Sequence, residues 1–275
     1  MPNMKLFYKC TAAITAILLI ALVSGCARLN DGVILAGSTS VQPFAEILAE
    51  EYYLLHPEKI VDVQGGGSSA GISAAQSGTA DIGMSSRRLK ENESALWSVE
   101  IAKDSLAIIV HPQNPVNDLT MEQLRDIYSG KIGNWSELGG HDAKIHIIAR
   151  EAGSGTRSSF TDMVMGDVRI SPKALIQNSN GAIRLLVADD QNAVGFISSG
   201  ILDHTVKPVS LDGVLPTGEN IVSGDYKLFR PFLFVCQAEP TGETKAFIDF
   251  TLSSHGQRIL AGEGLIPVAK GVIEP

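Results

Sequence analysis

Cysteine is scarce in this sequence, which has three cysteines among its 275 residues. If the leading segment is removed at Cys26, only Cys26 and Cys236 remain, and modification of Cys26 would leave Cys236 without a partner. A disulfide framework is therefore not expected. Cys236 lies in the apolar run 231–236, which predicts a buried thiol of low reactivity.

Positive charge is also in deficit, because 22 Lys and Arg residues and 30 Asp and Glu residues give a net charge of −8. Nucleic-acid-binding proteins usually have the opposite sign, so we expect no nucleic-acid partner. An acidic protein can still bind a small anion where backbone dipoles and one or two arginines form a local site. The other composition values, 44% hydrophobic residues and 27 glycines, are those of a globular protein of one large domain or two ordinary ones.

An apolar run of membrane-spanning length is missing. Residues 12–23 are apolar but fall short of the roughly 20 residues that a spanning helix needs. They follow Lys5 and Lys9 and end in Val-Ser-Gly-Cys at 23–26, which resembles a bacterial lipoprotein signal. An ordinary signal peptide with a chance cysteine is the alternative. We therefore expect a signal peptide over 1–25 and a tether over 26–32 that is anchored to the cell membrane by lipid (palmitate) on Cys26.

Catalytic and metal-binding motifs are missing as well. The sequence has no G-x-x-x-x-G-K-[ST], no H-E-x-x-H and no C-x-x-C, and its six histidines are scattered. The glycine–serine turn at 153–155 does not match the G-x-S-x-G of a serine nucleophile, and the turn at 67–71 (Gly-Ser-Ser-Ala-Gly) matches only its spacing, with no partner base evident in the sequence. We expect no metal, no cofactor and no enzymatic activity.

The sequence does contain a repeated order of apolar strand, polar turn and helix. This order predicts an α/β protein with mainly parallel sheets flanked by helices. In such sheets ligands bind at the carboxyl ends of strands. The expected strands are 33–36, 60–63, 80–84, 106–110, 145–149 and 229–235, and the expected helices are 41–56, 70–77, 120–128, 244–261 and one that begins near 156.

Three of the polar turns share one design, at 37–40, 65–69 and 153–156. Each follows an apolar strand, combines glycine with serine or threonine, and precedes a helix. Backbone N–H groups at a helix start, hydroxyl donors and a close backbone approach at glycine all suit an oxyanion. Any one turn alone is more often a helix cap. Two nearby arginines, Arg87 and Arg150, supply donor forks that match a tetrahedral anion.

Six blocks of sequence, in the same order, resemble the PstS-like phosphate-binding lipoproteins that serve phosphate ABC importers: 36–43, 64–72, 80–87, 126–135, 150–157 and 193–197. The resemblance implies a two-lobe type II periplasmic-binding-protein fold with phosphate between the lobes. Lobe one is expected over 33–110 and 228–275 and lobe two over 111–227, with hinges near Val110 and Phe229. It also implies an extracytoplasmic monomer, in the periplasm or on the outer face of the cytoplasmic membrane, that delivers phosphate to permease subunits.

The resemblance also implies a set of ligand-binding residues. Some members of the family place an aspartate at the position of Ser86, where it accepts the proton of hydrogen phosphate and rejects sulfate. The nearest acid here is Asp81, so the means of sulfate rejection is left open. The implied ligand residues are Thr39, Ser40, Ser68, Ser69, Ser86, Arg87, Arg150, Ser154, Gly155 and Thr156.

Three alternatives remain beside phosphate transport. The same fold can bind sulfate, molybdate or another tetrahedral oxyanion. A phosphatase could use the same cleft, although the sequence shows neither a nucleophile–base pair nor a metal set. A surface protein without a transport role could retain the scaffold.

Overall fold

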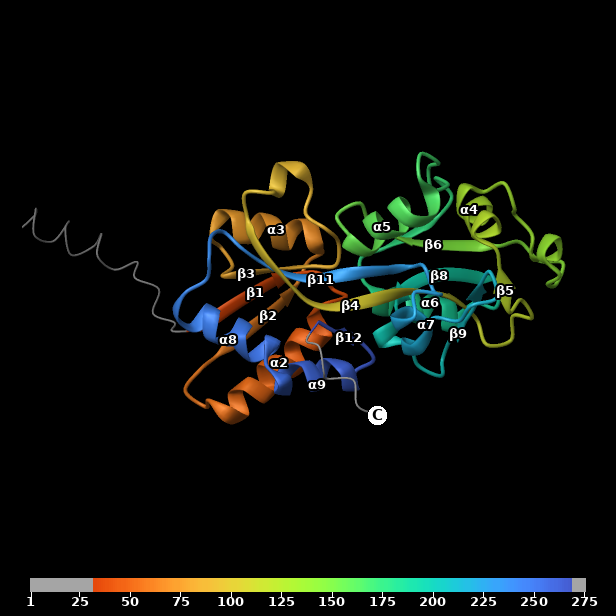
Figure 1. Ribbon diagram of the computed structural model, residues 1–275. Coiled ribbons are helices and arrows are strands. Elements are labelled where there is room, and N and C mark those ends of the chain that lie inside the picture. The colour runs from red at the N-terminus through yellow and green to blue at the C-terminus, as the bar shows by residue number, and fades with distance from the viewer. Residues whose placement is uncertain (1–31, 269–275) are drawn as a thin grey trace, which may run out of the picture. The chain divides into compact units, whose positions relative to one another are not determined.

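The computed structural model describes residues 32–268, which form one compact unit. The expected signal peptide, Cys26 and the tether up to residue 31 lie outside the described residues, as do residues 269–275. Figure 1 shows the helices and strands. Among the described residues no helix combines the length and apolarity that crossing a membrane requires.

The strands form one mixed sheet with the order β2-β1-β3-β11-β4-β8-β6-β7, in which β9 and β12 also pair with β4. A separate pair, β5 and β10, lies outside it. The strands are β1 (Val33–Gly37), β2 (Val61–Gly65), β3 (Ile82–Ser85), β4 (Trp97–Val110), β5 (Asp118–Leu119), β6 (His146–Arg150), β7 (Leu175–Gln177), β8 (Ala193–Ser198), β9 (Lys207–Pro208), β10 (Ser210–Leu211), β11 (Phe229–Cys236) and β12 (Ile266–Pro267).

Helices cover both faces of this sheet (Figure 1). Short 3-10 turns and one π-helical turn, which continues α5, connect some of the elements. The α-helices are α2 (Gln42–Leu55), α3 (Ser68–Ser77), α4 (Met121–Ser129), α5 (Gly155–Phe160), α6 (Asn180–Asp189), α7 (Gly218–Val222), α8 (Gly242–Leu252) and α9 (Ser254–Gly262). The expected α/β fold is therefore confirmed.

Lobe one is built around the parallel strands β1, β2 and β3, with β11 antiparallel to β3. Side chains on β11 alternate between the two faces, as the twofold repeat of a strand requires. Phe232 and Phe234 pack with α2 and α8 in one core, whereas Leu233 and Val235 pack with α3 on the other face. Both faces are therefore covered, which explains the continuous apolar run in the sequence.

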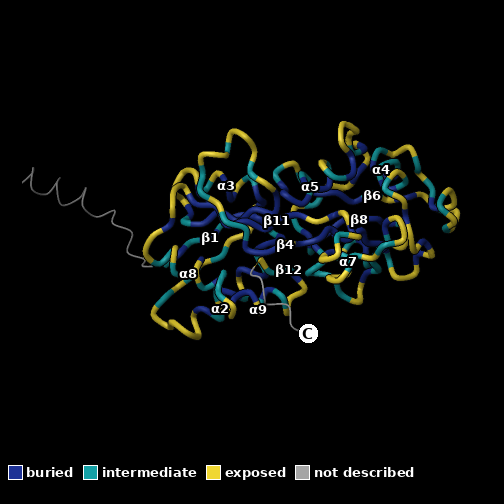
Figure 2. Tube along the Cα trace, viewed as in Figure 1, coloured by how far each residue is buried: buried dark blue, intermediate teal, exposed yellow. Residues whose placement is uncertain are grey.

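Lobe two repeats this plan with the parallel strands β6, β7 and β8. Val194 and Phe196 on β8 face the core beneath α4 and α5, where Phe196 stacks on Phe160 at a centroid distance of 4.1 Å. Ala193 and Ile197 face α6 on the other side of the sheet. In Figure 2 the strands are mainly dark blue, the colour of buried residues.

Strand β4 belongs to both lobes. Its first part pairs with β11, and its last five residues, from Leu106, pair with β8. The core contacts change at the same point, because Ala102 packs in lobe one and Leu106 packs in lobe two. Strands β4 and β11 therefore run side by side from one lobe towards the other.

The expected strands and most expected helices are confirmed within a few residues. Strand β4 is longer than expected, since it begins at Trp97 rather than at Leu106. The single helix expected over 244–261 is wrong. Ser253 adopts an extended conformation with ψ 161° and accepts a hydrogen bond from the N–H of Gly256, so it ends α8 and caps α9.

Candidate functional site

The carboxyl ends of parallel strands from both lobes meet at one buried polar cluster. Strand β1 leads into the turn that holds Ser38 and Ser40, and β2 leads into α3, which begins at Ser68. From lobe two, β6 leads into the turn before α5, and β7 leads into α6. Because these strands run in parallel within each lobe, their ends deliver polar turns to the same edge of the sheet.

Ser40 connects the two lobes at the centre of this cluster. Its Oγ lies 2.8 Å from Thr156 Oγ1 and accepts hydrogen bonds from Asn180 Nδ2 at 2.7 Å and Arg230 Nη2 at 3.2 Å. All four side chains are at most 2% exposed. The hydroxyl is therefore surrounded by donors, two of which come from lobe two.

Three further serines form a second group beside Ser40. Ser38 Oγ donates to Ser86 Oγ at 2.9 Å, and the Ser86 backbone N–H donates to Ser68 Oγ at 3.0 Å. Gly155 of lobe two lies directly against them. A Cβ at this position would come within 2.3 Å of Ser68 Oγ and 2.6 Å of Ser86 Oγ, so the close approach of α5 requires glycine.

Arg150, at the end of β6, is 1% exposed and holds its guanidinium in a fixed orientation. Nε and Nη2 donate to the carboxylate of Glu151 at 2.9 and 3.0 Å, and Nη2 also donates to Thr39 Oγ1 at 3.0 Å. Nη1 is buried and has no hydrogen-bond partner among the described residues. A buried donor of this kind is costly unless it serves a ligand.

A second buried guanidinium, that of Arg230, comes from the strand β11 that runs between the lobes. It lies opposite Asp104 of β4 and donates to Asp104 Oδ2 through Nε and Nη2 at 3.1 and 2.9 Å. Ser198 of lobe two donates to the other carboxylate oxygen at 2.7 Å, and Arg230 also reaches Ser40. Burial raises the pKa of Asp104, and the neighbouring guanidinium opposes that shift.

The two guanidinium groups act on one another. Burial lowers the pKa of Arg230, Asp104 opposes that shift, and the positive charge of Arg150 lowers the pKa further. Two cations held close together in a protein interior repel each other, and an anion that contacts both relieves the repulsion. The cluster is thus rich in donors and positive charge, which suits a small oxyanion.

The structure brings most of the residues predicted from sequence together, although their roles differ. Ser40, Ser68, Ser86, Gly155 and Thr156 lie in the cluster, and Thr39 supports Arg150. Ser154 lies at the edge, where its Oγ caps α5 by accepting the Arg157 N–H.

Arg87 and Ser69 lie at the periphery. The Arg87 guanidinium donates to both carboxylate oxygens of Glu93 at 2.7 and 2.8 Å, and Nη2 reaches Ser69 Oγ at 3.4 Å. The Ser69 N–H donates to Gly153 O across the lobes at 3.1 Å. The hydrogen bond from Arg87 keeps the pKa of Glu93 below its usual value. Arg87 therefore has a dedicated counter-ion.

Sequence reasoning missed Ser38, Asn180 and Arg230. Arg230 had a signal in the sequence, since it is a lone cation in an otherwise apolar strand and would need a buried partner. Asn180 follows Ser179, which caps α6, and nothing in its immediate sequence distinguishes it from an ordinary first-turn residue.

The cluster lacks the parts of a hydrolytic site. Among residues 32–268 no group of three or more His, Cys, Asp or Glu side chains is arranged to hold a metal ion. The cluster serines bond to one another, to Asn180 and to Arg230, and none of these partners is a general base of the usual kind. The arrangement can bind and enclose an anion.

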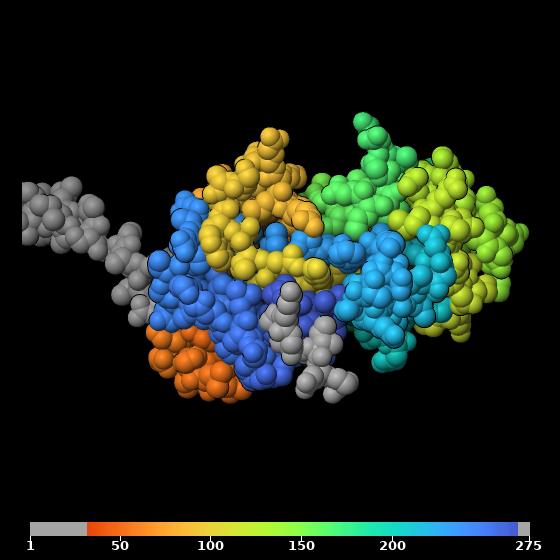
Figure 3. Space-filling view, viewed as in Figure 1, coloured from red at the N-terminus to blue at the C-terminus, as the bar shows by residue number. Residues whose placement is uncertain are grey.

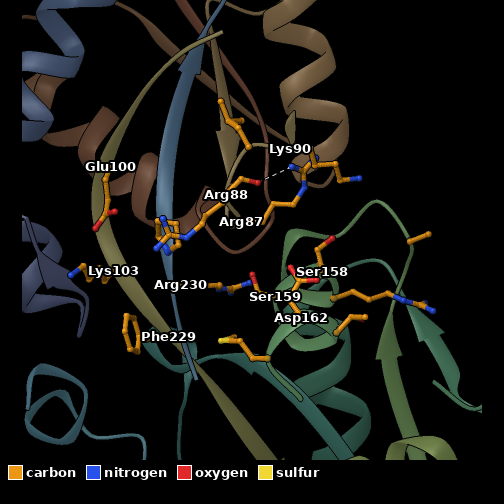
Figure 4. A pocket seen from close by; sticks show the side chains of 16 residues that line it. Arg87, Arg88, Lys90, Glu100, Lys103, Ser158, Ser159, Asp162, Phe229 and Arg230 are labelled. Atoms are coloured by element: carbon orange, nitrogen blue, oxygen red, sulfur yellow. Dashed lines mark hydrogen bonds between the residues drawn. The ribbon is translucent and has the colours of Figure 1, made fainter. Parts of the chain in front are cut away.

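A cavity of about 630 Å³ lies next to the cluster, between the lobes. In the space-filling view it is the hollow between the segments coloured yellow and green (Figure 3). Figure 4 shows Arg230 and Ser159 on its inner wall. The Ser159 Oγ of lobe two donates to Ser86 O at 3.2 Å, which closes the wall between the cavity and the cluster.

Comparisons with known proteins relate the chain to a defined group. The model of the PBP superfamily domain matches residues 24–255. The phosphate-binding protein PstS of Bacillus subtilis is 32% identical over 247 residues, which cover 88% of this chain and 82% of that protein. The crystal structure of a putative phosphate ABC transporter substrate-binding protein with bound phosphate, from Clostridium perfringens, is 45% identical with a TM-score of 0.84, covering 87% of this chain and 100% of that one. An ABC-type phosphate transport receptor from Vibrio cholerae is 44% identical with a TM-score of 0.72, covering 85% and 99%.

Proposed function

The chain belongs to the PBP superfamily and, within it, to the PstS phosphate-binding proteins, and we propose that it captures inorganic phosphate between its lobes outside the cytoplasm and delivers it to an ABC importer. The Clostridium perfringens relative holds phosphate and is a putative transporter substrate-binding protein. The proposal transfers that role to this chain and includes no catalytic step.

The observation that carries the proposal is the buried, unpartnered Nη1 of Arg150, on a lobe-two guanidinium whose Nη2 reaches Thr39 of lobe one. A guanidinium fork offers parallel donors that match a tetrahedral oxyanion, and charge-assisted hydrogen bonds are the strong ones. Micromolar affinity requires about 8 kcal/mol of net binding free energy. Several such bonds in a site from which water is excluded supply that amount.

We propose a ligand set that extends the one predicted from the sequence. Thr39, Ser40, Ser68, Ser86, Arg150, Gly155 and Thr156 surround the anion, and Ser69, Arg87 and Ser154 hold the surrounding turns. The additions are Ser38, Asn180 and Arg230, which contact the cluster through the bonds described above.

Selection of phosphate over sulfate requires an acceptor for the proton of hydrogen phosphate, because sulfate has no proton to donate at neutral pH. The two carboxylates nearest the cluster, Asp104 and Glu151, are engaged by Arg230 and Arg150. The Oδ1 atom of Asn180 is buried and without a hydrogen-bond partner among the described residues. We propose that this amide oxygen, with the serine hydroxyls, accepts the proton. Sulfate and molybdate remain the second candidate ligands, because within residues 32–268 no free carboxylate is found bonded to the cluster to repel them.

The proposal keeps the lobe boundaries predicted from the sequence, 33–110 with 228–275 and 111–227, except that residues 106–110 are assigned to lobe two, with which they pack. Because β4 contributes to both cores, the hinge would act through β4 and β11 near the Asp104–Arg230 pair. Phosphate would favour the closed form through contacts that only the closed form offers.

Calorimetry tests the function. The protein is expected to bind inorganic phosphate with micromolar or tighter affinity and to prefer it to sulfate and molybdate in competition. The variant Arg150→Ala should bind at least about tenfold more weakly, since one charged hydrogen bond is worth about 1.5–3 kcal/mol. Arg258→Ala, an exposed position on α9, is the matched control. Unchanged phosphate binding in Arg150→Ala would remove Arg150 from the site. If the unaltered protein bound sulfate more tightly than phosphate, sulfate would replace phosphate as the proposed ligand.

We also propose that residues 1–25 are removed and that lipid on Cys26 anchors the chain to the membrane as a monomer. The support is the sequence pattern at 23–26, and the tether up to residue 31 lies outside the described residues. Metabolic labelling with a palmitate analogue should mark the protein, and Cys26→Ala should abolish the label and release the protein from membranes. Retention of the label in that variant would refute the anchor.

A further inference from the structure

The cavity between the lobes carries a charge opposite to that of the chain. Its lining contains six basic side chains and two acidic ones, Glu100 and Asp162, a net charge of +4. Glu93 and Asp104 pair with two of the basic groups, and including them leaves +2. The whole chain has a net charge of −8. A positive cleft in an acidic protein concentrates field lines that attract small anions.

Besides Arg87 and Arg230, the cations of the cavity come from several segments. Arg88 and Lys90 follow β3, Lys103 projects from β4 in lobe one, and Arg157 lies on α5 of lobe two. Figure 4 shows Arg88 and Lys103 at the cavity, together with Arg230 of its inner wall. Among the described residues Arg88 and Lys103 form no ion pair, so their charges are not neutralised locally.

The cavity and the polar cluster are separated by one layer of side chains. Arg230 lines the cavity and also donates to Ser40 Oγ, and Ser159 lines the cavity and donates to Ser86 O. Ser159 belongs to lobe two and Ser86 to lobe one, so movement of the lobes apart breaks this bond. Opening of the hinge would therefore join the cavity to the cluster.

The cavity is also larger than the anion alone requires. A volume of 630 Å³ corresponds to about twenty waters at roughly 30 Å³ each. A phosphate ion can therefore enter with part of its hydration shell and lose that shell at the inner wall.

We propose that this cationic cavity is the entry path for the oxyanion, in which Arg88 and Lys103 accelerate capture while Arg230 receives the anion at the inner wall. The inference rests on the proposed function of phosphate binding. Arg88 and Lys103 attract the anion at a distance and do not contact it in the closed form. Their removal therefore changes the association rate and leaves the dissociation rate nearly unaltered.

The test is stopped-flow fluorescence of the purified protein mixed with inorganic phosphate, at about 10 mM and about 0.5 M ionic strength. The double variant Arg88→Gln, Lys103→Gln should associate about three- to tenfold more slowly at the lower ionic strength. The ratio of the two association rates, original to variant, should fall below about twofold at the higher ionic strength, because the Debye length is then shorter than the width of the cavity. The dissociation rate should stay within about twofold of the original.

The matched control is Lys144→Gln, Lys173→Gln, which removes two exposed lysines from a different cavity of lobe two. It changes the net charge of the chain equally and should leave association within about twofold of the original. Equal slowing in both double variants would overturn the entry path, as would an unchanged rate in Arg88→Gln, Lys103→Gln with normal calorimetric affinity. Failure of the unaltered protein to bind phosphate would instead refute the proposed function.

Discussion

The substitution Gly155→Ala tests the closed arrangement of the lobes. The added methyl would lie 2.3 Å from Ser68 Oγ and 2.6 Å from Ser86 Oγ, both on the opposite lobe. To admit it, the two hydroxyls must rotate away or the lobes must separate. Loss of two hydrogen bonds at about 1 kcal/mol each gives about 2 kcal/mol, which is within the 1–3 kcal/mol typical of overpacking. Phosphate affinity should fall by about 30-fold.

The thermal stability of Gly155→Ala should stay close to that of the original protein even though its phosphate affinity falls. The φ angle of Gly155 is outside the left-handed region, so alanine meets no backbone penalty, and separation of the lobes would remove the two hydroxyl contacts that the methyl makes. Gly218→Ala is a close control, because Gly218 also begins a short helix after a capping hydroxyl residue and has open space around it. Calorimetry and thermal denaturation of both variants measure the two effects. Full affinity in Gly155→Ala would refute the closed geometry described here.

Three further predictions concern the buried charges and the thiol. Asp104→Asn leaves Arg230 buried without its counter-ion and should destabilise the fold by about 3–5 kcal/mol in denaturant titration, whereas Asp104→Leu combined with Arg230→Met should recover much of the stability without phosphate binding. Glu93 has a lowered pKa from its bond with Arg87, so it stabilises the fold above its ordinary pKa of about 4.5 and loses that contribution as the pH falls through the folded value. Glu93→Gln should accordingly be less stable than the original at neutral pH and equally stable in acid, and a constant difference would contradict this. Burial raises the pKa of Cys236 to about 11, so native protein lacking residues 1–26 should not react with Ellman's reagent at mildly alkaline pH and should expose one thiol in denaturant.

The strands that the sequence predicts well are those buried on both faces. The apolar run of β11 is recognisable because helices cover both sides, and the same holds for the last five residues of β4. The first part of β4 has exposed Lys103 and Ser98 beside buried Ile101, and this mixed pattern hides the strand. The break between α8 and α9 at Ser253 was also hidden. The helical spacing of apolar residues continues across it, whereas the hydrogen bond of the Ser253 side chain to the start of α9 ends one helix and begins the next.

The candidate site was predictable where a strand leads directly into a turn and a helix. Thr156 and Ser40 were found because glycine–hydroxyl turns follow apolar strands, although their contact at 2.8 Å depends on lobe closure. Arg87 was predicted as an anion ligand from its position after β3, but Glu93 on the following turn engages it. Such pairings between nearby charges depend on turn geometry, which residue types alone do not determine.

The role of Arg230 in the cluster could not be predicted without knowing how β11 pairs with β4. Its partner Asp104 is more than a hundred residues away in sequence, and only the antiparallel pairing of β4 with β11 places the two side chains next to each other. The pair also explains why a cation is tolerated on a strand that is otherwise buried, since an unpaired guanidinium there would cost several kcal/mol. The two arginines thus enter the cluster from different lobes, each with its own carboxylate.

A crystal structure of the protein grown with inorganic phosphate tests the central claim most directly. A tetrahedral anion should lie within hydrogen-bond distance of Arg150 Nη1, of Ser68 and of Thr156, with both lobes in contact with it. Density for the anion elsewhere, or a closed form in which these three residues share no ligand, would contradict the account.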